Sequence, residues 1–143
     1  MSEPTDRGPT YEVQPVGWVE SPLTDRAAAP KQGDEGAPTA RVVFRAGLEE
    51  ATAGLRAGDE VILLTWLHQS RRDVLSVRPR GDLSRPVQGV FSTRSPDRPN
   101  PIGLHAVTII GTEGNAVVVE GLEAIDGTPV LDVKPVLRAA RGR

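Results

Sequence analysis

Residues 106–120, AVTIIGTEGNAVVVE, are the part of the sequence that best indicates the fold. Two runs rich in valine and isoleucine, 106–110 and 116–120, flank the polar, glycine-containing segment 111–115. β-branched residues favour strands, and a short connection that contains glycine favours a tight turn between them. We therefore predict an antiparallel hairpin over residues 106–120.

Similar short runs, separated by glycine and proline, recur on both sides of this hairpin. Residues 21–38 are rich in both and predict a long loop. Helical spacing of Leu48, Ala51, Thr52 and Leu55, with Gly58 after it, predicts one short helix. We expect further strands at 13–19 (with Val16 and Trp18 on one face), 40–44, 60–67, 74–77, 87–91, 130–133 and 136–137. Many short, mainly antiparallel strands with one or two short helices indicate a mostly β fold, either a small barrel or a sandwich.

Length and composition indicate one domain. The chain has 143 residues, of which 38% are hydrophobic and 25% charged. We expect a loose tail over residues 1–10 and a single domain over residues 11–143. The absence of cysteine excludes disulfides and thiolate chemistry, and His68 and His105 have no metal-ligand spacing, so we expect no metal. The longest apolar run, 61–64, is too short to cross a bilayer, and no apolar signal core is present at the N-terminus, so we expect a cytoplasmic protein.

Charge and motifs narrow the classes of function. The net charge of −2 argues against a general nucleic-acid binder. Arginines nevertheless cluster at positions 71, 72, 78, 80, 85, 94 and 98, which is either a site for a phosphate-bearing ligand or a solvated basic face. There is no G-x-G-x-x-G after a strand and no G-x-x-x-x-G-K-[ST], which argues against a Rossmann-type methyltransferase or dehydrogenase.

The segment 89–104, GVFSTRSPDRPNPIGL, is the best functional candidate in the chain. Prolines at 96, 99 and 101 fix their own φ angles and favour extended conformations before them. Arg94 and Arg98 would then be held on a stiff frame that loses little entropy when a ligand binds. The alternative is a structural crossover with solvated arginines.

Two further segments each have a structural and a functional interpretation, and a third has only a structural one. His68, after the apolar run 60–67, either caps a strand end or contacts a ligand at the mouth of a barrel. Asp126-Gly127-Thr128-Pro129 predicts a turn that would expose a carboxylate, a hydroxyl and backbone amides in a fixed array. Pro30-Lys31-Gln32-Gly33 by itself indicates only a loop.

Together these segments resemble the TsaA-like, or TrmO, family. The resemblance rests on P-K-Q-G, W-x-x-H, GVFSTRSPDRPNPIGL and DGTPVLDVKP, in this order, and covers roughly residues 14–137. It implies a β-barrel S-adenosylmethionine-dependent methyltransferase, generally homodimeric. The family activity it implies is methylation of the exocyclic nitrogen of threonylcarbamoyladenosine beside the tRNA anticodon.

The resemblance also assigns residues to a cofactor pocket. Lys31 stands where the family has arginine in its P-R-Q loop. The residues that match the family's cofactor contacts are Pro30, Lys31, Gln32, His68, Gln69, Arg94, Leu104, Asp126, Gly127, Thr128 and Pro129. Substrate contacts are expected at Arg71, Arg98, Asn100 and Lys134. Asp126 and Asp132 are the candidates for a general base, which an acidic acceptor N–H would favour.

Some positions depart from the family pattern. Val136 replaces a tyrosine and His105 a serine, and we expect the C-terminal domain of longer bacterial members to be absent. Loss of an aromatic side chain would remove a stacking surface for a base. Three hypotheses follow: a tRNA adenosine methyltransferase, a small-molecule N- or O-methyltransferase of the same fold, and a barrel that binds S-adenosylmethionine or a nucleotide without chemistry.

Overall fold

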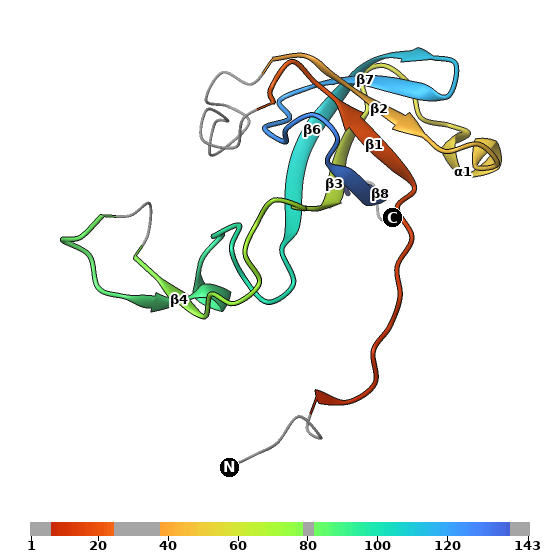
Figure 1. Cartoon of the computed structure of the whole chain (residues 1–143). Coiled ribbons are helices and arrows are strands. Elements are labelled where there is room, and N and C mark those ends of the chain that lie inside the picture. Colours follow the sequence, from red (N-terminus) through yellow and green to blue (C-terminus); the bar gives the residue numbers. More distant parts are fainter. Residues whose placement is uncertain (1–6, 25–37, 79–81, 138–143) are drawn as a thin grey trace.

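Six strands close into a barrel because alternate side chains of each strand point into one shared core. A computed structural model describes residues 7–24, 38–78 and 82–137 (Figure 1). The strands are β1 (Gly17–Glu20), β2 (Ala40–Phe44), β3 (Glu60–Trp66), β6 (Ile102–Glu113), β7 (Ala116–Glu120) and β8 (Pro129–Pro135). They follow the order β1-β2-β7-β6-β3-β8 around the barrel, and every neighbouring pair is antiparallel. The predicted mostly β barrel is confirmed.

The core is apolar and draws one or more side chains from every barrel strand. Its most deeply buried members are Val19, Val42, Leu63, Ile109, Val119 and Val130. Leu122 and Ala124, which follow β7, belong to the same cluster. Burial of such side chains is the main favourable contribution to folding.

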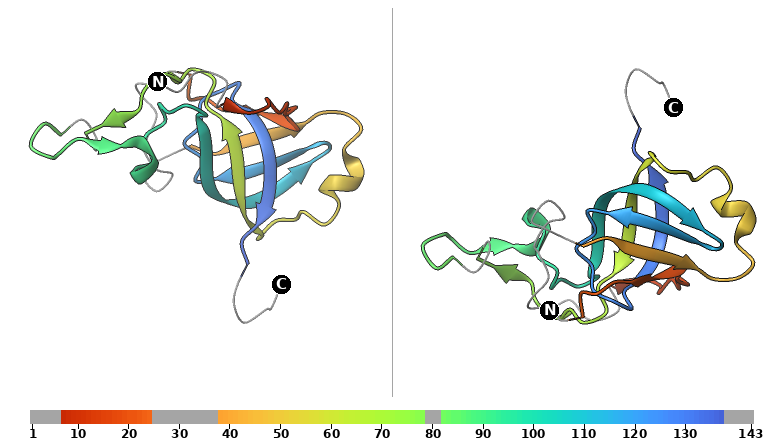
Figure 2. Two further views of the ribbon diagram at one scale, coloured as in Figure 1. Left: turned by 90° about the horizontal axis from the view of Figure 1, so that it is seen from below. Right: turned by 90° about the horizontal axis from the view of Figure 1, so that it is seen from above.

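The remaining elements lie outside the barrel wall. Helix α1 (Glu49–Thr52) follows β2 and buries none of its residues. Strands β4 (Ser76–Val77) and β5 (Gln88–Gly89) form a separate two-stranded sheet, followed by the 3₁₀ turn η5 (Val90–Ser92). These last three elements lie in residues 67–101, the connection between β3 and β6, which projects from one end of the barrel and which we call the arm (Figure 2).

Several predicted element boundaries were wrong. Outside the barrel, the strands predicted at 74–77 and 87–91 are only the two-residue strands β4 and β5, with residues 90–92 in a 3₁₀ turn. The first strand begins at Gly17 rather than at residue 13, because Pro15 has no N–H for a sheet ladder, and Trp18 points outward rather than sharing a buried face with Val16. β6 begins at Ile102 rather than at 106, since Gly103 occupies an inward position without an apolar side chain and so concealed the alternation. The two runs predicted at 130–133 and 136–137 correspond to one strand, β8, which ends at Pro135.

The antiparallel order gives the barrel two distinct ends. β1, β3 and β7 finish at the end where β2, β6 and β8 begin. The described parts of the connections from β3 to β6 and from β7 to β8 therefore lie at this end, together with residues 21–24 and 38–39, and we call it the motif end. Helix α1 and the β6–β7 turn lie at the opposite end (Figure 2).

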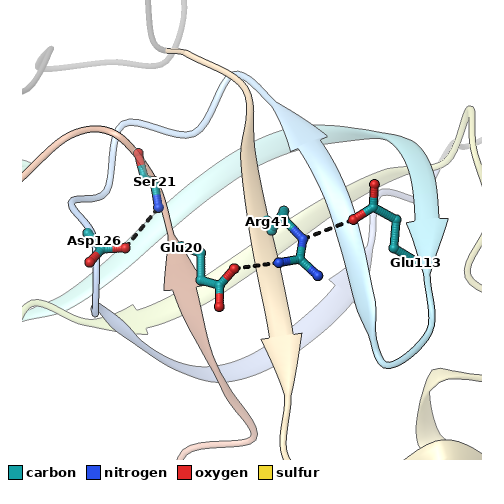
Figure 3. A network of polar contacts seen from close by, with 5 residues as sticks. All are labelled: Glu20, Ser21, Arg41, Glu113 and Asp126. Carbon is teal, nitrogen blue, oxygen red and sulfur yellow. Dashed lines mark hydrogen bonds and ion pairs between the residues drawn. The ribbon is translucent and has the colours of Figure 1, made fainter.

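An ion-pair network crosses the outer face of the barrel. Arg41 of β2 reaches Glu20 of β1 at 2.5 Å and Glu113 of β6 at 3.0 Å (Figure 3). All three side chains are 41% exposed or more. The first pair links two strands that are already paired, and the second spans from β2 across β7 to β6. Exposed ion pairs of this kind contribute little free energy.

Candidate functional site

The predicted cofactor contacts that the structure describes lie in two connections at the motif end and in the strands that follow them. His68, Gln69 and Arg94 lie in the arm, and Asp126–Thr128 lie in the connection from β7 to β8. A third connection, from β1 to β2, contains Pro30, Lys31 and Gln32, which lie outside the described residues, as do residues 1–6 of the predicted tail. Segments far apart in sequence are thus gathered by the strand order alone.

The base of the arm is held together by hydrogen bonds between its two halves. Leu67 N–H donates to Pro101 O at 2.8 Å, where the arm leaves and rejoins the barrel. Arg71 N–H donates to an oxygen of the Asp97 carboxylate at 2.9 Å. Arg72 donates to Pro99 O and to Asn100 Oδ1, and its guanidinium lies 5.0 Å from the ring centre of Trp66. The proline-rich segment therefore has a fixed position relative to the end of β3.

Arg98 holds the proline-rich segment from within. Its guanidinium donates to the carbonyl oxygens of Val90, Thr93 and Ser95, with Nε 2.8 Å from Ser95 O. An arginine fork that joins several carbonyls fixes the turn they belong to. Arg98 was predicted to contact substrate, and the contacts it makes in the structure are with its own chain.

Arg94 differs from Arg98 in being exposed. Among the described residues, its guanidinium has no hydrogen-bond or ion-pair partner. His68 and Gln69 are also exposed, in the arm directly after β3. Leu104 lies on the outer face of β6, opposite Leu64 of β3. Within the described part of the chain, Arg94 is thus an unpaired cation of the arm, and β6 carries exposed apolar side chains where it begins.

The segment 126–129 forms the turn that its sequence predicted. Gly127 has a φ of +83°, a conformation that glycine adopts without a steric cost. The Asp126 carboxylate accepts a hydrogen bond from Ser21 N–H at 3.0 Å (Figure 3). Thr128 is buried and donates to Ile125 O, and Pro129 begins β8. Asp126 and Gly127 remain exposed at the motif end.

A buried polar layer beneath these segments was missed by the sequence analysis. His105 Nδ1 lies 2.5 Å from Glu123 Oε1, and Nε2 lies 2.7 Å from Thr65 Oγ1. The side chains of His105 and Glu123 are 5% and 18% exposed. Alternation along β3 and β6, which puts residues 65 and 105 inside the barrel, is the signal that could have identified the layer.

Gly103 makes this layer possible. A Cβ atom at position 103 would lie 2.5 Å from Thr65 Oγ1 and 2.6 Å from His105 Nε2. The glycine of the N-P-I-G-L run therefore leaves the space in which the threonine and the histidine meet.

Other predicted residues lie apart from the motif end or contact their own chain. Asp132 and Lys134 are further along β8, exposed, and paired with each other at 3.3 Å. Asp132 also lines a cavity of about 840 Å³ between α1 and the barrel, at the opposite end. Apart from Asp132, none of the predicted site residues lines this cavity, so we do not take it as the site.

Ion pairing within the arm shifts two pKa values. Arg71 donates from Nε and Nη2 to both oxygens of Asp73, at 3.0 Å each. This hydrogen bonding lowers the pKa of Asp73 and raises that of Arg71. In the same way the Ser84 hydroxyl lowers the pKa of Asp82. Arg71, predicted to contact substrate, is thus engaged by its neighbour.

Two further observations apply to residues 7–24, 38–78 and 82–137. No helix among them is long and apolar enough to cross a membrane. No three histidine, aspartate or glutamate side chains among them gather where they could hold a metal ion.

The barrel with its motif loops at one end defines a class of protein for which solved structures exist. The structure of TrmO from Pseudomonas aeruginosa superposes with a TM-score of 0.73 and 31% identity, covering 94% of this chain. This chain spans 59% of the length of that one. The model of the "tRNA-methyltransferase O N-terminal domain" matches residues 18–140. The chain belongs to the TrmO family, as the sequence motifs predicted.

Curated relatives carry related names. A protein of Methanothermobacter thermautotrophicus named "Probable S-adenosyl-L-methionine-binding protein" is 42% identical over 123 residues, covering 86% of this chain and 88% of its own. A protein of Archaeoglobus fulgidus named "S-adenosyl-L-methionine-binding protein" is 38% identical over 125 residues, covering 85% of this chain and 86% of its own.

Proposed function

We propose that this chain is an S-adenosylmethionine-dependent methyltransferase whose cofactor binds at the motif end of the barrel. The observation that carries the proposal is the position of two motif-bearing connections, from β3 to β6 and from β7 to β8, at one end of a TrmO-family barrel. The names of the relatives from Methanothermobacter and Archaeoglobus support the choice of cofactor.

The groups at the motif end fit the chemistry of this cofactor. Arg94 has no ion-pair partner in residues 7–24, 38–78 and 82–137, and its charge suits the cofactor's carboxylate. Asp126 uses Oδ1 to accept from Ser21 N–H, which leaves Oδ2 to accept from a hydroxyl group of a ligand. Ile102 and Leu104 present exposed apolar side chains on β6. Pro30, Lys31, Gln32, His68, Gln69 and Pro129 complete the proposed set.

Bound at this end, the cofactor would supply an electrophilic methyl group. The task of the protein is then positional, because an acceptor must approach within roughly 3–3.5 Å of that group and in line with it. The stiff arm suits this task, since its proline-rich segment is already fixed by Arg72 and Arg98. Asp126 is the better placed of the two candidate bases, because Asp132 lies towards the opposite end.

The acceptor proposed first is the exocyclic nitrogen of threonylcarbamoyladenosine beside the tRNA anticodon. It follows from membership of the TrmO family and from the position of the arm's arginines near the motif end. Asn100, at the base of the arm, is retained as a candidate substrate contact, whereas Lys134 lies even further along β8 than Asp132 and is not. A cytoplasmic location is part of this proposal.

A small-molecule acceptor is the second candidate, and one observation favours it. Most of the described arm arginines contact their own chain: Arg71 binds Asp73, Arg72 binds Pro99 and Asn100, Arg78 binds backbone carbonyls, and Arg98 binds three carbonyls. These contacts weaken the arm as a surface for the RNA backbone. The valine at position 136, where the family has tyrosine, also favours a small-molecule acceptor.

A homodimer is also proposed, formed through the apolar surface of the arm. Leu75, Leu83 and Phe91 are 70%, 82% and 84% exposed, and large apolar side chains left exposed on one part of a protein are candidates for an interaction site. Phe91→Asp should convert the dimer to a monomer in light-scattering measurements. A wild-type monomer, or a Phe91→Asp dimer, would contradict this assignment.

The test of the activity uses labelled S-adenosylmethionine and total tRNA from a strain that lacks the endogenous enzyme. Transfer to the modified adenosine supports the first acceptor. Cofactor binding without transfer to tRNA leaves the small-molecule enzyme and the non-catalytic binding protein, which a panel of small acceptors would separate. Absence of binding would overturn the proposal.

Arg94→Ala tests the location of the site by calorimetry with S-adenosylmethionine. We expect affinity to fall about tenfold or more, the range for loss of a charged hydrogen bond. Arg85→Ala is the matched control, because Arg85 is also an exposed arm arginine, and it should bind like the wild type. Equal affinities for the two variants would show that the site lies elsewhere.

A further inference from the structure

The connection from β7 to β8 must cross the end of the barrel. In the closed order β1-β2-β7-β6-β3-β8, three steps separate β7 from β8 in either direction, so the two strands stand on opposite sides. Residues 121–128 join them at the motif end. Leu122 and Ala124 of this connection are buried in the core, which shows that the chain passes over the barrel's interior rather than around its rim.

Where it approaches β8, this crossing connection forms hydrogen bonds with β1 and with the residues that follow β1. Gly127 N–H donates to Val19 O at 2.7 Å, and Asp126 N–H donates to Leu23 O at 2.6 Å. Ser21 N–H returns a bond to the Asp126 carboxylate at 3.0 Å. The exposed turn is therefore anchored where it reaches β8 and β1.

The part of the connection closer to β7 is anchored by the side chain of Glu123, which contacts His105 inside the barrel. Glu123, between Leu122 and Ala124, accepts from His105 Nδ1, and Thr65 holds the opposite nitrogen of the ring. The ring cannot shift freely, because Thr65 and Gly103 pack against it from β3 and β6. A largely buried carboxylate that lost this partner would be strongly disfavoured in its present place.

We propose that His105 is a positioning residue, which through Glu123 sets the connection 121–128 and with it the Asp126–Pro129 turn for ligand binding. The part concerning the ligand rests on the proposed function, whereas the part concerning the connection does not. His105 and Thr65 are fixed on two strands of the barrel wall, so the barrel serves as the rigid reference for the turn.

The test uses two pairs of variants, and the first pair distinguishes the contact made by Nδ1 of His105 from the contact made by Nε2. His105→Asn places an amide N–H near the position of Nδ1 and retains a donor for Glu123. His105→Gln places its amide nitrogen near Nε2 and retains only the contact with Thr65. A second pair of variants changes the partner of the His105 ring. Glu123→Gln keeps an acceptor for Nδ1, and Glu123→Ala removes it.

Amide hydrogen exchange of the ligand-free protein is the first readout. In His105→Gln and Glu123→Ala, exchange at Asp126 and Gly127 should rise about tenfold or more, while amides of β3 stay protected. His105→Asn and Glu123→Gln should stay close to the wild type. If the members of a pair exchange equally, or if β3 loosens together with the turn, His105 supports the barrel generally and the proposal is overturned.

Calorimetry with S-adenosylmethionine is the second readout. Affinity should fall about tenfold in His105→Gln and Glu123→Ala and persist in the two conservative variants. Unchanged affinity despite faster exchange would overturn the claim on ligand binding. If the wild type does not bind the cofactor, the proposed function fails, and the exchange measurements still decide whether His105 positions the turn.

Discussion

The guanidinium group of Arg98 donates to the carbonyl oxygen of Thr93, five residues earlier in the chain, at 2.5 Å. The same group also reaches the carbonyls of Val90 and Ser95, so one side chain closes the turn that follows η5. Arg94 lies inside this loop and has no such contacts among the described residues. The two arginines of the proline-rich segment therefore have different tasks, one internal and one directed outward.

Arg98→Ala should loosen the arm. Loss of charge-assisted hydrogen bonds to carbonyls should cost about 1.5–3 kcal/mol of local stability, and Arg98→Lys should not restore it, because an ammonium group lacks the planar fork. Amide exchange at Thr93 and Arg98, whose N–H groups donate to Val90 O and Arg71 O, measures this. Arg94→Ala is the control and should leave exchange unchanged. Full rescue by lysine would contradict the fork geometry.

Gly103→Ala should destabilise the barrel by about 1–3 kcal/mol, since the added methyl group would overlap the Thr65–His105 contact. Gly111→Ala, in the same strand, meets nothing within 4 Å and serves as the matched control. Urea unfolding of the two variants gives the comparison. Equal stability of both would mean that the polar layer can rearrange at no cost.

The sequence predicted the barrel strands well where valines follow one another in a short apolar run, as at 40–44 and 116–120. It failed where a glycine or a polar residue occupies an inward position. Gly103, Thr65 and His105 all point into the barrel, so the start of β6 and the polar layer were both missed.

The site was predictable as a set of motifs but not as a geometry. Nothing local in the sequence distinguishes Arg98, which binds carbonyls, from Arg94, which is free to meet a ligand. Glu123 carries no motif, and its contact with His105 depends on a connection that crosses the barrel. Such long-range pairings are set by strand order.

The Arg71–Asp73 pair should be visible in a titration. Because Arg71 lowers the pKa of Asp73 in the folded protein, the contribution of the pair to stability is complete above the ordinary aspartate pKa and is lost as the pH falls through the lowered value. Carbon-13 NMR of the carboxyl groups should show the pKa of Asp73 rising in Arg71→Gln. The pKa of Asp82, lowered by Ser84, should not move. A shift at both aspartates would indicate a general change in the arm.

Arg41→Ala should have a small effect despite its two ion pairs. Exposed pairs contribute about 0–1 kcal/mol each and are screened by salt, so the cost should shrink further in 1 M sodium chloride. Urea unfolding at low and high salt measures this difference. A loss above about 2 kcal/mol that persists in high salt would show that Arg41 acts through packing rather than charge.

Strand β8 pairs with both β1 and β3, and it is the last strand of the barrel to leave the ribosome. Until residues 129–135 have been synthesised, the edges of β1 and β3 have no partner and are open to association with other chains. A nascent chain that stalls before residue 129 would already contain most of the proposed ligand contacts and still be prone to aggregate. Solubility during synthesis therefore depends on the barrel strand that is made last.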